Sequence, residues 1–143
     1  MSSTKTKPQK KLLIVEDDVV NRTVMELQLQ KYFQIDLAKD GKEAMELFSQ
    51  NEYNLIIMDI NLGIGKNGIE VMKEIRNTDK GKTIPVIAIT AYANFGDRES
   101  FLSAGFDNYV SKPYHIDDLL RCIIDSINIY NLGLIPKSEA LSS

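Results

Sequence analysis

The chain has 143 residues, a hydrophobic content of 43%, a charged content of 26% and a formal net charge of −3. These values are typical of a globular protein with one domain, and they give no electrostatic case for a nucleic-acid partner. No apolar run approaches the roughly 18 residues of a membrane span, and the single cysteine excludes an internal disulfide. The polar, basic N-terminus lacks the apolar core of a secretory signal, so we expect a cytoplasmic protein that binds neither nucleic acid nor membrane.

The first part of the chain predicts a tail, a strand and a helix. Residues 1–10 lack apolar periodicity, so we expect a flexible tail. The aliphatic run KLLIV (11–15) predicts a strand, and a helix is expected from Val19 to Tyr32. The apolar residues that recur at roughly helical spacing in that helix are Val20, Val24, Leu27 and Leu29.

Four further strand–helix pairs follow. The expected strands cover residues 35–38, 54–59, 83–90 and 107–111. The expected helices lie around 44–51, 69–75, 96–105 and 116–127. Strands that alternate with helices in this way predict an α/β fold with a doubly wound parallel sheet. We expect one domain over residues 11–129, with residues 130–143 as a tail or the stub of a linker.

Chemically useful side chains stand where four of these strands end. Glu16 and Asp17 follow the first strand, and Asp59 ends the third. Thr90 ends the fourth strand, and Lys112 follows the fifth. Crossovers in parallel sheets are right-handed, so the carboxyl ends of the strands share one edge, and ligands bind there. We therefore expect three carboxylates, a hydroxyl and an ammonium group to lie together at that edge.

Three neighbouring carboxylates repel one another unless a cation lies between them. Mg²⁺ suits such a set because it binds a few carboxylates, keeps several waters and accepts a substrate phosphate. Lys112 and Thr90 are a cation and a hydroxyl that can bind phosphoryl oxygens. A carboxylate can itself attack a phosphoryl group and form an aspartyl phosphate. The pattern thus predicts Mg²⁺-dependent phosphorylation of Asp59, with Glu16 and Asp17 holding the metal.

Four stretches carry a resemblance to a known family: LLIVEDD, LIIMDINL, VIAITAYA and YVSKPY. Through them, residues 11 to about 129 resemble the receiver domain of two-component response regulators. The resemblance implies a flavodoxin-like (βα)5 fold with a five-stranded parallel sheet of order 2-1-3-4-5, as in CheY. The stretch EDDVVNR also resembles the receivers that are fused to hybrid histidine kinases.

The resemblance assigns the metal and acceptor roles residue by residue. Glu16 and Asp17 would be the acidic metal pair, Asp59 the phospho-acceptor, and Asn61 would lend its backbone carbonyl to the metal. Asp18 falls one place beyond the metal pair, and we expect it to cap the first helix. The loop at 62–68 departs from the family pattern, with glycine in place of proline and one extra residue, and this departure bears on metal-loop geometry and partner choice.

The remaining roles concern the phosphoryl group and the switch. Lys112 would be the phosphate-binding lysine, in a peptide bond to Pro113 that the family holds cis. Thr90 would be the switch hydroxyl, with Ala91 beside it leaving room for the phosphoryl group. Tyr109 would be the aromatic residue that turns inward on activation.

The leading prediction is a signalling switch in a His-Asp phosphorelay. Its partners would be a histidine kinase or histidine phosphotransfer protein and a downstream protein that the sequence does not identify. A homodimer through the last two helices is left open.

Two alternatives stay open at this point. Phosphohydrolases of the haloacid-dehalogenase class also use Asp, Thr and Lys with Mg²⁺, but they need an acid–base aspartate where this chain has Asn61. An amide cannot shuttle that proton, so we expect a persistent phosphoryl group and no true enzyme. Tyr92, two residues after Thr90, is expected to cover that group in part and slow its hydrolysis. The other alternative is a receiver-like binding module without phosphorylation.

Overall fold

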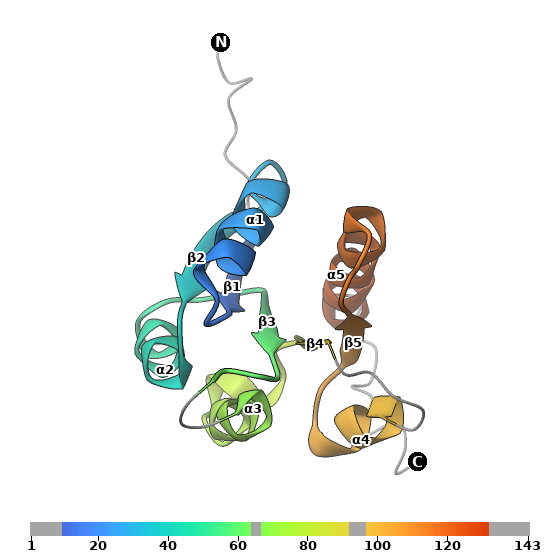
Figure 1. Cartoon of the computed structure of the whole chain (residues 1–143). Helices are drawn as coiled ribbons and strands as arrows, with labels where there is room; N and C mark the ends of the chain where they lie inside the picture. The colour runs from blue at the N-terminus through green and yellow to red at the C-terminus, as the bar shows by residue number, and fades with distance from the viewer. Residues whose placement is uncertain (1–9, 64–66, 92–96, 132–143) are drawn as a thin grey trace.

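The computed structural model describes residues 10–63, 67–91 and 97–131 (Figure 1). The strands are β1 (Lys11–Val15), β2 (Gln34–Ala38), β3 (Leu55–Asp59), β4 (Val86–Thr90) and β5 (Asn108–Ser111). The helices are α1 (Val19–Leu29), α2 (Gly41–Gln50), α3 (Gly68–Arg76), the short 3-10 helix η2 (Lys80–Lys82), α4 (Asp97–Ala104) and α5 (Ile116–Asn131). The five strands form one parallel sheet of order β2-β1-β3-β4-β5, which confirms the predicted flavodoxin-like fold.

Helices cover both faces of the sheet, and side chains alternate between two apolar clusters (Figure 1). On β1, Leu13 and Val15 join the cluster under α2, α3 and α4, whereas Leu12 and Ile14 join the cluster under α1 and α5. Because successive residues of a strand face opposite sides, a strand buried on both faces is apolar throughout. No helix within the described ranges is both long and apolar enough to span a bilayer.

Element boundaries differ from expectation at three places. Helix α1 ends at Leu29, because the amides of Tyr32 and Phe33 both bond back to the Leu29 carbonyl and close the turn. Strand β4 begins only after Pro85, whose carbonyl accepts a hydrogen bond from Ile56 although its nitrogen has no hydrogen to donate. Helix α5 runs to Asn131, beyond the helix end expected near residue 127.

The apolar residues that recur along α1 are buried only in part. Met25 and Leu29 are buried, whereas Val20, Val24 and Leu27 are 63%, 44% and 57% exposed. The helix carries two apolar stripes, and periodicity alone does not tell which of them meets the sheet. The second stripe therefore lies on the surface beside α5.

Candidate functional site

Strand register brings the expected site residues to one edge of the sheet. Val15 pairs with Met58, so the next residues, Glu16 and Asp59, stand beside each other at the ends of β1 and β3. Asp59 pairs in turn with Ile89, and this places Thr90 at the same edge. These positions follow from backbone pairing alone, which is why strand order sufficed to predict them.

Three carboxylates meet at this edge. One oxygen each from Glu16, Asp17 and Asp59 lies within 4.8 Å of the other two. Glu16 is 1% and Asp59 4% exposed, whereas Asp17 is open to solvent. Two buried acids and one exposed acid form a set of hard oxygen ligands with an open side, which fits Mg²⁺ and its retained waters.

Lys112 supplies a positive charge inside the cluster. Its Nζ lies 3.1 Å from Glu16 Oε1 and 3.3 Å from Asp59 Oδ2. Its backbone amide donates to the Thr90 carbonyl over 2.8 Å, so the loop after β5 is fixed to the end of β4. The following peptide bond, to Pro113, is cis.

The close approach of these acids and their burial shift pKa values within the cluster. Burial, together with a hydrogen bond to Asp59, raises the pKa of Glu16 to about 7, and Lys112 opposes this only in part. Burial acts to lower the pKa of Lys112, yet that pKa is raised because Glu16 and Asp59 stabilise the ammonium. A divalent cation at this site would act against the rise in the pKa of Glu16, because it stabilises the charged carboxylate.

The loop after β3 approaches the acids closely. The backbone N–H of Asn61 donates to Asp59 Oδ1 over 3.0 Å and orients that carboxylate. Gly63 has φ +73°, and a Cβ there would lie 2.8 Å from Asp17 Oδ2. A positive φ together with this close approach requires glycine, so the residue that replaces the family's proline fits the metal side of the site. Residues 64–66 lie outside the described residues.

The turn between β1 and α1 is held by polar contacts. Asp18 accepts from the Asn21 amide over 2.8 Å, which confirms the predicted helix cap. Its own amide donates to Glu16 Oε2 over 3.1 Å. Arg22 Nη1 donates to the carbonyls of Glu16, at 2.8 Å, and Asp17, at 3.2 Å. Sequence reasoning did not assign Arg22 to the site, although its place four residues after Asp18 puts it on the same side of the helix.

The expected switch residues Thr90 and Tyr109 lie on the neighbouring strands β4 and β5. Thr90 is 2% exposed, and Ala91 beside it is open to solvent. Tyr109 lies opposite Ala88, and its half-buried ring packs with its centroid 5.8 Å from that of Phe101 on α4. Tyr92 lies outside the described residues, so its covering role stays a prediction.

Comparison with known proteins settles the family. The sequence pattern of the response regulator receiver domain matches residues 12–124. The chain belongs to this family. Two curated relatives of this receiver are 39% identical to it, and one of them is hybrid signal transduction histidine kinase I of Dictyostelium discoideum. The chain spans only 17% and 7% of the length of these two relatives, while they match 81% and 79% of the chain.

Two solved structures are similar to this receiver. The receiver domain of a sensor histidine kinase from Pseudomonas aeruginosa, with magnesium in its active-site cleft, is 36% identical with a TM-score of 0.76. That match covers 83% of this chain and 98% of the other. The second is the receiver domain of Ssk1 from Saccharomyces cerevisiae, solved with the histidine phosphotransfer protein Ypd1. Here the identity is 29% and the TM-score 0.76, over 88% and 94% of the two chains.

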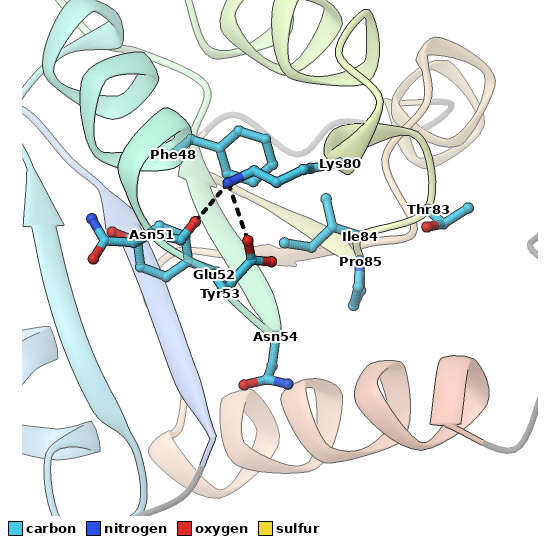
Figure 2. A pocket seen from close by; sticks show the side chains of 9 residues that line it. All are labelled: Phe48, Asn51, Glu52, Tyr53, Asn54, Lys80, Thr83, Ile84 and Pro85. Carbon is cyan, nitrogen blue, oxygen red and sulfur yellow. Dashed lines mark hydrogen bonds and ion pairs between the residues drawn. The ribbon is translucent and has the colours of Figure 1, made fainter.

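A hollow of about 210 Å³ lies at the amino ends of β3 and β4, opposite to the acidic cluster (Figure 2). It is bounded by the residues that precede β3 and β4. Lys80 reaches into it over the Phe48 ring, but its Nζ already contacts the Asn51 carbonyl at 2.9 Å and Glu52 Oε2 at 3.6 Å. The lining includes one acid, Glu52, so within the described part of the chain this hollow lacks the three grouped carboxylates found at the carboxyl ends of the strands.

Proposed function

We propose that this receiver accepts a phosphoryl group on Asp59 from a phosphohistidine of a kinase or phosphotransfer protein. The observation that carries the proposal is the position of the Asp59 carboxylate, which lies 3.3 Å from Lys112 Nζ and within 4.8 Å of two further acids. A nucleophilic carboxylate with a fixed cation beside it is poised for phosphoryl transfer.

In the transfer, a carboxylate oxygen of Asp59 forms a bond to phosphorus as the N–P bond of the donor breaks. The donor imidazole keeps the electron pair of that bond and takes a proton. Glu16, Asp17 and Asp59 would hold Mg²⁺, which when bound neutralises charge on the transferring oxygens. Lys112 binds a phosphoryl oxygen, and the backbone N–H of Asn61 holds the acceptor carboxylate in place.

The product is proposed to act as a signal in the cytoplasm. Asn61 offers an amide where a phosphohydrolase would need a general acid, so we infer slow hydrolysis and no catalytic turnover. Thr90 and Tyr109 would carry the change to the face formed by α4, β5 and α5. Couplings of this kind are typically about 1–3 kcal/mol, which suffices to bias a two-state surface.

A groove beside the site offers a surface for the phosphoryl donor. One hollow of about 430 Å³ is lined by Val24, Met25, Lys112, Pro113 and Tyr114, among others. A second, of about 340 Å³, shares its Val24 and Gln28 and continues along α1 and α5. We call these two hollows the α1 groove.

We propose that a helix of the phosphohistidine donor occupies the α1 groove. The groove begins at Lys112, so a helix lying in it would bring a histidine close to Asp59. Val24 and Leu27, which are exposed and line the groove, supply apolar area for such a helix. Support also comes from the similar Ssk1 receiver, which was solved with a histidine phosphotransfer protein.

Leu27→Asp is expected to slow phosphoryl transfer from phosphorylated Ypd1 by about tenfold or more, because it places a charge in the apolar groove. Phosphorylation by acetyl phosphate is expected to stay unchanged, because a small donor does not need the groove. Ile129→Asp, at a residue 43% exposed on α5 and outside the groove lining, is the matched control. Equal slowing with both donors, or none with Ypd1, would contradict this docking surface.

The direct test of the function is intact-mass analysis after incubation with acetyl phosphate. We expect the wild-type protein to gain one phosphoryl group with Mg²⁺ and none after chelation, and Asp59→Asn to gain none in either case. Steady release of phosphate over many cycles from a phosphate ester would support a phosphohydrolase instead. A wild-type protein that gains no phosphoryl group would favour a module that signals by binding alone.

A further inference from the structure

Arg22 joins helix α1 to the turn that carries two of the metal-site acids. It lies in the first half of α1 and is half-buried. One nitrogen, Nη1, donates to both the Glu16 and the Asp17 carbonyls, at 2.8 and 3.2 Å. A single guanidinium nitrogen thus bridges two successive peptide groups.

The bridge acts on the direction of the acidic side chains. Glu16 is also held by its amide, which donates to the Ala38 carbonyl over 3.0 Å, and by packing, since it is 1% exposed. Asp17 is exposed and has no such packing. Fixing the two carbonyls restricts rotation of the peptide groups on both sides of Asp17, and so restricts where its carboxylate can lie.

Charge gives a second reason to expect an effect on a cation. Among the described residues, the cluster of three carboxylates includes one ammonium, that of Lys112, which pairs with Glu16 and Asp59. Arg22 adds another positive charge directly behind the two acids that follow β1. This charge lowers the cost of keeping the three acids ionised together, yet it sits on the backbone side and leaves their open side to a metal.

We propose that Arg22 is a positioning residue that sets the affinity of the acidic cluster for a divalent cation by orienting Glu16 and Asp17. The inference rests on the proposed function, because it concerns the same metal site. Groups that orient metal ligands from behind commonly change metal affinity by about 10–100-fold when they are replaced. A role confined to folding would instead change stability and leave the affinity of the folded protein unaltered.

The test is calorimetric titration of the whole chain with MgCl2. We expect Arg22→Met to raise the Mg²⁺ dissociation constant about tenfold or more. Arg22→Lys keeps the charge, but the shorter lysine side chain is less suited to bind two carbonyls at once. We therefore expect its Mg²⁺ affinity to lie between those of the wild type and Arg22→Met. Arg121→Met, which removes an exposed arginine of α5, controls for net charge and should match the wild type. Melting temperatures in chelator, which we expect to be nearly equal, report any loss of fold.

Each outcome is informative. Wild-type affinity in Arg22→Met would overturn the proposal, and so would wild-type affinity in Arg22→Lys, because charge alone would then be sufficient. A lower melting temperature in chelator with unchanged Mg²⁺ affinity would mean a purely structural role. If the wild type itself bound no Mg²⁺, the proposed function would fail, and that result is distinct from a failure of Arg22 alone.

Discussion

Lys112→Met is expected to slow Mg²⁺-dependent phosphorylation of Asp59 by about 100-fold or more. The ammonium lies 3.3 Å from Asp59 and 3.1 Å from Glu16, where negative charge gathers as the phosphoryl group arrives. Removing one such preorganised donor commonly costs about 10²–10³ in rate. The time course of intact mass with acetyl phosphate at saturating Mg²⁺ measures the effect.

The control for this variant is Lys82→Met, which removes a lysine of η2 that is 65% exposed and forms an ion pair with Asp79. Its rate should equal that of the wild type. Lys112→Met should also raise the pKa of Glu16 further, because it removes the hydrogen bond from Lys112 that lowers this pKa in the wild type. A rate for Lys112→Met within threefold of the wild type would remove this lysine from the chemistry.

Gly68→Ala is expected to destabilise the protein by about 3 kcal/mol, at the upper end of the usual cost of overpacking. Gly68 is the first residue of α3, where helix propensity alone would favour alanine. A Cβ at this position would, however, lie far inside contact distance of the Asp59 carbonyl oxygen and 2.9 Å from Ile60 Cα. Both are backbone atoms, so no rotamer change relieves the clash, and the end of β3 itself must shift.

Gly41→Ala is the matched control, because Gly41 is the first residue of α2. Its added Cβ would meet a side-chain atom, Val71 Cγ2, at 2.6 Å. A side chain can give way more easily than backbone, so we expect a smaller loss of unfolding free energy. Urea unfolding, with equal m values for the variants, measures both. A loss at Gly68 no larger than that at Gly41 would contradict the clash with β3.

The strand ends were predictable because topology fixes them. Once the alternation of strands and helices indicates a parallel sheet, Glu16, Asp59, Thr90 and Lys112 have to share an edge, however far apart they lie in the sequence. No side-chain detail enters that argument. Similarly, the cap at Asp18 follows from a short-range rule that needs only the next few residues.

Features that depend on long side chains or on competing apolar stripes were not predictable. The face of α1 with Val24 and Leu27 has the same spacing as a buried face, and only packing against the sheet selects Met25 and Leu29. Arg22 has several rotatable bonds, so the sequence does not indicate that it turns back to two carbonyls. The raised pKa of Glu16 depends on how deeply its carboxylate is buried, which the sequence pattern does not predict.

The bridge from Arg22 has a consequence for how a partner and a metal act on each other. The same helix carries Arg22, which holds the acidic turn, and Val24, which lines the α1 groove. A helix that shifts when either ligand binds couples the two ligands thermodynamically, and such coupling is reciprocal. If bound Mg²⁺ changes the affinity of the groove for a helix by some factor, the bound helix changes the affinity for Mg²⁺ by the same factor. The donor protein would then arrive at a receiver whose metal is held more tightly, or more loosely, by the act of docking itself.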